Sequence, residues 1–212
     1  MKLRFLLLCF LFFSCKTFSQ HKAIHFYSSI ATFTNAPSIV MKGPTLVGGG
    51  IDPVGNGSYC FGINYTAQIK KALEFETGIQ MTFNKIKVSY QNDMPYYPNI
   101  LMPSPTYGNI DLISIPVKAR LSFLKYFFVT GGVLFDFETK NSVRDSSNNQ
   151  LINSQSGIGI VVSAGAKYDF KEHITVFTNL TIEDHGIYLY QKLKYPFQIN
   201  NLFLNMGIGY RF

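Results

Sequence analysis

Apolar and polar residues alternate strictly along much of this chain, and this pattern constrains the fold more than any other feature. The final segment, NLFLNMGIGYRF, is the clearest case. Six apolar residues share one of its faces: Leu202, Leu204, Met206, Ile208, Tyr210 and Phe212. A period of two is the period of a β-strand whose two faces meet different surroundings. The pattern therefore predicts a fold built from strands.

Eight segments carry this alternation, each of about 10–14 residues, which is long enough to cross a bilayer at a tilt. They cover residues 23–33, 59–69, 73–83, 113–123, 127–137, 158–169, 174–183 and 202–212. In the first segment apolar residues lie on both faces, as Ile30 and Phe33 show. Pro116 lies inside the fourth segment, and since proline cannot donate to a strand ladder, a local bulge is expected there.

The links between these segments alternate in length. Short links fall near residues 70–71, 124–125 and 170–172. Long links, rich in Pro, Gly, Asn and Ser, fall at residues 34–57, 91–107, 140–156 and 190–198. Short turns at one end and long loops at the other are typical of bacterial outer-membrane barrels, and an even strand count places both termini at the short-turn end.

The polar face of the segments is rich in Gly, Ser, Asn, Thr and Gln and carries few charges. Small polar residues suit the crowded interior of a narrow barrel, whereas a barrel surrounded by water shows an exterior rich in Lys, Glu and Thr. The other face is Leu, Ile, Val, Phe and Ala, with Tyr near several strand ends, as lipid and its interfaces require. We therefore expect an all-β fold: an eight-stranded antiparallel up-and-down transmembrane β-barrel. A soluble lipocalin-like binding barrel is the alternative, because its strands alternate as well.

The first residues have the features of an export signal. A positively charged start precedes an apolar run, Phe5–Phe13, of about nine residues, the length of a signal-peptide core. Small residues at positions 17 and 19 indicate cleavage after Ser19, so residues 1–19 are expected to be a signal peptide and residues 20–212 the barrel domain. Lipidation of Cys15 is the alternative. Either route takes the chain out of the cytoplasm.

One group of charged residues is expected inside the barrel, near its short-turn end. Glu74 and Glu76 follow the short link at 70–71, and Lys118 and Arg120 precede the short link at 124–125. Alternation places all four on the polar face of two adjacent antiparallel strands, at similar depth. Because an unpaired charge in a lumen without bulk water is costly, opposite charges at one level should pair, with Arg120 as the bidentate partner. Four separately hydrated charges are the alternative.

Basic residues also collect at the expected outer strand ends and loops. They are Lys85, Lys87, Lys140, Arg144, Lys192 and Lys194. These side chains could meet the phosphates of outer-membrane lipid, or they could be solvated lysines and arginines at the rim.

The sequence shows no catalytic, cofactor-binding or metal-ligating set, and no cofactor is expected. The four histidines, His21, His25, His173 and His185, do not form a metal-type pattern, and His185 is expected to be a rim residue. Cys60 is expected to be a small buried residue. The formal net charge of +7 is dispersed along an exported chain, which argues against a nucleic-acid partner.

The final residues MGIGYRF resemble the assembly signal of outer-membrane proteins. The segment DLISIPVKARL, Asp111–Leu121, resembles an internal strand of the outer-membrane β-barrel family of Bacteroidetes, which includes PorT-like proteins and small OmpX-like barrels. The ending of the expected signal peptide, FSQ, also resembles signal peptides of that phylum. The resemblance implies an outer-membrane location, recognition of Tyr210 and Phe212 by the barrel assembly machinery, and secretion-system proteins as partners.

These observations predict a non-enzymatic outer-membrane barrel whose extracellular loops bind a partner, ligand or surface. The alternatives are a PorT-like component of a secretion or assembly system, an outer-membrane lipid-modifying enzyme, and the soluble binding barrel.

Overall fold

The computed structural model describes residues 22–35, 39–41, 49–92, 104, 106–144, 154–170, 173–189 and 199–212. Their strands are β1 (Lys22–Asn35), β2 (Ile39–Met41), β3 (Gly49–Lys70), β4 (Leu73–Asn92), β5 (Thr106–Phe123), β6 (Phe127–Asn141), β7 (Gly157–Phe170), β8 (Ile174–Leu189) and β9 (Ile199–Arg211). No helix within these residues is long and apolar enough to cross a bilayer. The expected signal peptide, residues 1–19, lies outside the described residues.

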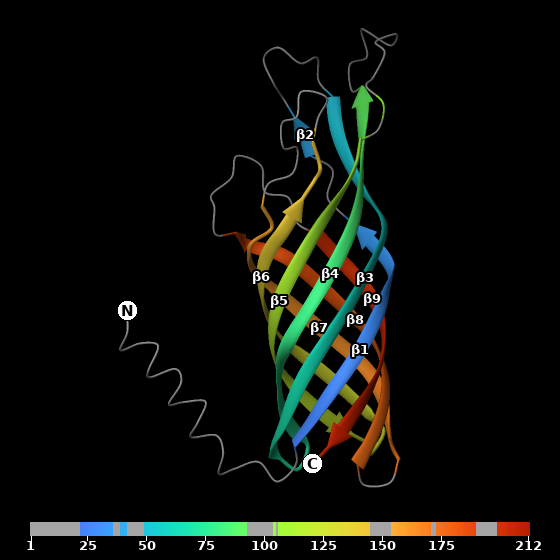
Figure 1. The fold of residues 1–212 in the computed structure, drawn as a ribbon, viewed down its shortest axis with the longest axis vertical. Coiled ribbons are helices and arrows are strands. Elements are labelled where there is room, and N and C mark those ends of the chain that lie inside the picture. Colours follow the sequence, from blue (N-terminus) through green and yellow to red (C-terminus); the bar gives the residue numbers. More distant parts are fainter. Residues whose placement is uncertain are drawn as a thin grey trace, which may run out of the picture.

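The strands form one closed ring. From β3 to β9 each strand pairs antiparallel with the next, and β1 pairs with both β9 and β3. β2 adds only a three-residue pairing at the outer end of β3, so the barrel wall has eight strands. Figure 1 shows their common tilt around the barrel. The predicted eight-stranded antiparallel up-and-down barrel is confirmed, and its closure leaves no open sheet edge in the wall.

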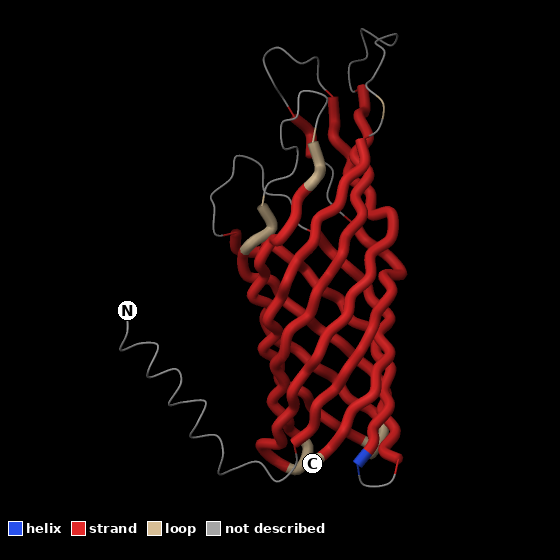
Figure 2. Tube along the Cα trace, in the orientation of Figure 1, coloured by secondary structure: helices blue, strands red, loops and turns tan. Residues whose placement is uncertain are grey.

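The two ends of the barrel differ as expected. Two-residue and three-residue turns, at residues 71–72 and 124–126, join β3 to β4 and β5 to β6. Leu124 and Lys125 have positive φ angles of 49° and 64°, as tight hairpin turns require. The C-terminus lies at this same end, which we call the turn end (Figure 2). The opposite end, at which the chain leaves β4 at Asn92 and returns in β5 at Thr106, is the loop end.

Most strands are longer than the alternation predicts, and β3, β4 and β5 extend farthest beyond their expected segments. β3, β4 and β5 have 22, 20 and 18 residues, whereas β7 and β9 have 14 and 13. The expected link at 34–57 was therefore wrong in part, because β3 already begins at Gly49 and β2 lies within that range. The ladder between β3 and β4 continues to the pair Gly49–Asn92, across a register shift between Gly55 and Ser58. Turn-forming residues do not end a strand while its partner continues beside it.

The polarity of the barrel is inverted relative to a water-soluble protein. Thr82, Asn84 and Ser114 are polar and fully buried inside the ring. On the outside, Ile182 and Met206 are each 60% exposed, and many other large apolar side chains share that surface. An apolar exterior of this extent around a polar interior fits lipid and not water. This arrangement rules out the soluble lipocalin-like alternative and makes the barrel a membrane-spanning one.

Aromatic side chains mark both borders of the apolar band. At the turn end the rings of Tyr126 and Tyr168 stack with centroids 6.2 Å apart, and at the loop end Tyr59 stacks on Phe83 at 4.8 Å. On β4 the outward face runs from Leu73 to Phe83, about 33 Å along the strand, which a tilt of about 40° reduces to about 25 Å. That height matches the apolar band of outer-membrane barrels.

The pairing of β1 and the pairing at Pro116 both bear on predictions made from the sequence. In β1 the register to β9 shifts between Ala31 and Phe33, which explains why apolar residues of this segment fell on both predicted faces. The bulge expected at Pro116 was wrong. Pro116 keeps the register of β5 with β6, opposite Leu134, and its missing N–H falls where the β4–β5 pairing is interrupted.

Candidate functional site

The four charged residues singled out in the sequence lie together in the lumen at the turn end. Glu74 is directly opposite Arg120, and Glu76 is directly opposite Lys118, on the adjacent strands β4 and β5. The carboxylate of Glu76 forms ion pairs with both Lys118 and Arg120, although its side chain is only 1% exposed. Arg120 Nη1 lies 3.7 Å from Glu74 Oε2.

Arg120 divides its guanidinium between two carboxylates, so the expected bidentate pairing with one carboxylate is not formed. Nη2 contacts Glu76 and Nη1 approaches Glu74. The guanidinium carbon also lies 4.7 Å from the ring centre of Phe128, which is buried in the lumen. Asn64 Nδ2 donates a 2.7 Å hydrogen bond to Glu76 Oε1. These contacts replace the water that an ionised Glu76 would otherwise need.

A fifth charged residue, Lys167, completes this turn-end cluster, and the sequence reasoning missed it. Its Nζ lies 3.4 Å from Glu74 Oε1 and donates a 3.0 Å hydrogen bond to Ser122 Oγ. Lys167 belongs to β7, which does not border β4, so no pairwise register could connect the two residues. The sequence did indicate its depth in the barrel, because Lys167 lies close to the turn-end terminus of its own strand, as Glu74 does.

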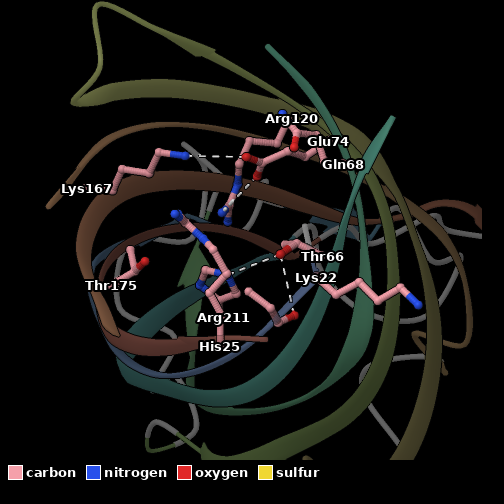
Figure 3. Close-up of a pocket in the computed structure, with 10 residues that line it drawn as sticks. Lys22, His25, Thr66, Gln68, Glu74, Arg120, Lys167, Thr175 and Arg211 are labelled. Atoms are coloured by element: carbon pink, nitrogen blue, oxygen red, sulfur yellow. Dashed lines mark hydrogen bonds and ion pairs between the residues drawn. The ribbon is translucent and has the colours of Figure 1, made fainter. Parts of the chain in front are cut away.

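The cluster borders a small pocket at the turn end of the lumen (Figure 3). Its lining residues include His25, Thr66, Gln68, Glu74, Arg120, Lys167, Thr175 and Arg211. Figure 3 shows Lys167 reaching toward Glu74, whereas Lys22 extends away from the other side chains. The volume open to a water-sized sphere is about 20 Å³, room for about one water molecule. Side chains therefore fill the lumen at this level.

A second polar network lies nearer the loop end and crosses the lumen. The hydroxyl of Tyr27 donates to Gln80 Oε1 at 3.0 Å. Gln80 Nε2 in turn donates to both carboxylate oxygens of Glu183, at 3.1 and 3.0 Å. These residues come from β1, β4 and β8, and β4 and β8 face each other across the barrel. We call this the cross-lumen network.

His185 continues the cross-lumen network and corrects a sequence expectation. It is fully buried in the lumen and not a rim residue. Its Nε2 lies 3.3 Å from Glu183 Oε2, and its Nδ1 lies 3.0 Å from Asp136 Oδ2. Ser114 Oγ donates to Asp136 Oδ1 at 2.5 Å. Alternation does place His185 on the same face as Glu183, but the expected strand ended at residue 183, whereas β8 continues to Leu189 and keeps His185 inside the barrel.

The other described histidines make contacts with neighbouring side chains, and Cys60 is buried. His25 Nε2 lies 3.2 Å from Thr66 Oγ1, and His173 stacks against Tyr210 at 5.9 Å. His21 lies outside the described residues. Cys60 is buried as expected, at 1% exposure. Within the part of the chain that the structure describes, no three His, Cys, Asp or Glu side chains are placed to hold a metal ion.

The basic residues expected at the outer rim are only partly described. Lys85 and Lys87 follow Phe83 on the outward face of β4. Lys140 is opposite Asp111 on the neighbouring strand, and Arg144 is exposed. Lys192 and Lys194 lie outside the described residues.

The aromatic residues expected to act in assembly lie at the end of β9. Tyr210 is 54% exposed and pairs with Ile24 on one side and Ile174 on the other. Phe212 is 58% exposed, and its backbone N–H donates to the carbonyl of Lys22 at 2.9 Å. Both rings therefore lie on the outer surface at the turn end.

No family model matches the sequence, and no curated protein matches it. Among solved structures the chain is similar to the outer membrane protein OprG from Pseudomonas aeruginosa, with 12% identity, a TM-score of 0.59, and coverage of 92% of this chain and 96% of that one. The outer membrane protein AlkL in lipid bilayers follows with 10% identity, 92% coverage of each chain and a TM-score of 0.46. Ail of Yersinia pestis, in complex with the heparin analogue sucrose octasulfate, has 11% identity, 91% and 98% coverage and a TM-score of 0.43. At such identities the likeness concerns the fold, which is that of small outer-membrane barrels.

Proposed function

We propose that this chain is a non-enzymatic outer-membrane barrel that acts through its loop-end surface, where it binds a partner, ligand or surface, and not through its lumen. One observation carries the proposal: the lumen is filled at two levels, while β3, β4 and β5 continue as paired strands beyond the rest of the wall.

The two levels of the lumen argue against conduction. Opening a path at the turn end would separate Glu76 from Lys118 and Arg120, which are buried with it. Opening a path farther along would separate Gln80 of β4 from Glu183 of β8, which are hydrogen-bonded across the lumen. Breaking a buried ion pair costs about 3–5 kcal/mol, so a closed lumen is the stable state.

The strand extension supports a binding role. From Phe83, at the loop-end aromatic border, β4 continues to Asn92, about 30 Å along the strand. It remains paired with β3 to Gly49 and with β5 to Thr106. A paired extension presents its connecting loops on a rigid support, which lowers the entropy that binding would otherwise cost.

Two measurements test this function. In planar bilayers the purified barrel should show no stable conductance, and steady open-channel currents would contradict the closed lumen. In intact cells a photo-crosslinking residue at Arg144, exposed at the loop end, should capture a discrete partner. The matched probe at Leu124, exposed at the turn end, should capture none. Capture from Leu124 alone would contradict a loop-end binding surface.

A PorT-like role in a secretion or assembly system is the second candidate. It is favoured by the resemblance of Asp111–Leu121, which forms most of β5. A secretion component must contact proteins on the periplasmic side, which is the turn end of the barrel. Co-purification of periplasmic secretion proteins, together with crosslinks from Leu124, would favour this role over the first.

We further propose that the barrel assembly machinery recognises Tyr210 and Phe212, whose rings lie on the surface of the closing strand. Deleting Phe212, or changing it to Asp, should reduce surface display several-fold. Phe212→Leu, which keeps an apolar side chain, should retain most of it. Undiminished display of the deletion would contradict this recognition.

A further inference from the structure

An outward-facing basic patch lies directly above the loop-end aromatic border. On β4 the outward residues after Phe83 are Lys85 and Lys87, because the intervening Asn84 and Ile86 are buried in the lumen. At about 3.3 Å per residue and a tilt of about 40°, Lys85 and Lys87 lie about 5 and about 10 Å beyond Phe83 along the membrane normal. The headgroup layer of a bilayer adds about 5–7 Å beyond the apolar core. Lys85 therefore lies within the layer of lipid phosphates, and Lys87 lies just beyond this layer, where its long flexible side chain can reach back into it.

The neighbouring strand supplies further polar groups at the same height. Asn109 is directly opposite Lys85, and Tyr107 is directly opposite Lys87. Tyr107 is 62% exposed, so its hydroxyl is accessible. Ser142 binds the backbone of Asn109, whose N–H donates to Ser142 Oγ at 2.8 Å. Lys85, Tyr107, Asn109 and Ser142 line a groove of about 300 Å³, and Lys87 lies one outward position farther along β4.

The backbone fixes the wall of this groove. The N–H of Ser142 also donates to the carbonyl of Asn109 at 3.0 Å, which holds the chain after β6 against β5. A Cβ at Gly108 would lie 2.7 Å from Val143 Cγ2, so the two segments are in close contact there. The polar groups of β5 and Ser142 are thus held in place beside the two lysines.

The charges on this face favour an anion. Among the side chains that the structure describes, which do not include that of Asp52 on the adjacent strand β3, neither Lys85 nor Lys87 has a carboxylate within ion-pair distance. The acidic side chain that shares this outward face on β5 is Asp111, which is opposite Phe83 on one side and Lys140 on the other. It lies one outward position closer to the apolar band than Asn109. A pair of cations at headgroup height, above aromatic rings that contact acyl chains, matches a lipid that carries phosphate.

We propose that Lys85, Lys87, Tyr107, Asn109 and Ser142 form a binding site for the phosphate group of an outer-leaflet lipid. The lysines provide the charge, and the Tyr107 hydroxyl and the Asn109 side-chain amide provide hydrogen-bond donors. Ser142, whose hydroxyl donates to the Asn109 carbonyl at 3.3 Å, positions Asn109. The stacked rings of Tyr59 and Phe83 lie beneath the site and contact the acyl chains of the same lipid.

The test uses the full barrel in detergent, titrated with a diphosphorylated glycolipid and monitored by native mass spectrometry. Lys85→Gln/Lys87→Gln should weaken retention of this lipid at least about tenfold at low salt. The matched control, Lys70→Gln/Lys71→Gln, removes two exposed lysines at the turn end and should leave retention unchanged. Lys85→Arg/Lys87→Arg should retain binding, and Asp111→Asn should strengthen it by about twofold. A gel-mobility shift on heating confirms that each variant is folded.

Three outcomes would overturn the site. The first is an equal loss in the turn-end control, which would indicate only a general effect of charge. The second is unchanged retention in the Lys85/Lys87 glutamine variant. The third is complete displacement of the lipid by inorganic phosphate at the same phosphate concentration, which would show a site for free phosphate and not for a lipid. Tight retention of the same glycolipid after its phosphates are removed would contradict phosphate recognition as well.

Discussion

The turn-end cluster and the cross-lumen network both fill the lumen with buried charge, but they are built in opposite ways. In the turn-end cluster a carboxylate, Glu76, lies between two cations from the adjacent strand. In the cross-lumen network an imidazole, His185, lies between two carboxylates, and one of them, Asp136, belongs to a strand that is not adjacent. The first depends on the register of two adjacent strands, and the second depends on side chains that meet over the intervening strand β7.

Gly159 shows how the second arrangement becomes possible. It lies on β7, between the strands of Asp136 and His185. A Cβ at this position would lie 2.5 Å from the carbonyl oxygen of Asp184 and 3.0 Å from Asp136 Oδ2. The missing side chain therefore lets Asp136 reach over β7 to His185. Contacts between neighbouring strands need no such gap.

The largest effect is expected from Glu76→Ala. This change leaves Lys118 and Arg120 buried without the carboxylate that they share, and should lower the free energy of unfolding by about 3–5 kcal/mol. Urea titration of the barrel in lipid vesicles measures it. Glu76→Gln keeps the shape and should remain strongly destabilised, because it also loses the charge. A loss below about 1 kcal/mol for Glu76→Ala would show that the cluster is hydrated and not paired.

Arg120→Ala should cost about 3 kcal/mol, since Glu76 retains Lys118 as a partner. The double variant Glu76→Ala/Arg120→Ala should lose less than the sum of the two single changes, by about 1–2 kcal/mol. The same titrations provide the double-mutant cycle. Strictly additive losses would mean that the two side chains do not interact.

Gly159→Ala tests the cross-lumen network and should cost about 2 kcal/mol, because the new methyl group meets a backbone oxygen that cannot easily move. Gly131→Ala is the matched control on the neighbouring strand β6. A Cβ there meets no atom within 4 Å, so this change should be close to neutral. Equal stability of the two variants would remove the role assigned to Gly159.

The smallest effect is expected from Glu74→Gln. This side chain is 20% exposed, and its contacts, at 3.7 Å to Arg120 and 3.4 Å to Lys167, are long. Solvent screening should reduce its contribution to below about 1 kcal/mol. Comparison with Glu76→Gln under identical conditions isolates the effect of burial. A loss equal to that of Glu76→Gln would show that both carboxylates are equally desolvated.

Local patterns in the sequence were sufficient for the fold and for neighbouring-strand contacts. The alternation identified every strand of the barrel wall, because inward and outward faces require different residue types along the whole length of each strand. The grouping of Glu74, Glu76, Lys118 and Arg120 could be inferred because two adjacent strands and their short turns fix the relative depth of residues.

The tertiary structure alone decided which residues meet across the lumen and where β3, β4 and β5 end. Lys167 joins the turn-end cluster, and Gln80 joins Glu183, only after the sheet has curled and closed into a barrel. The physical reason is the range of each constraint. Alternation reports on the environment of a single strand, and register reports on its neighbour. Contacts across the lumen depend on the tilt, bulges and closure of all eight strands together.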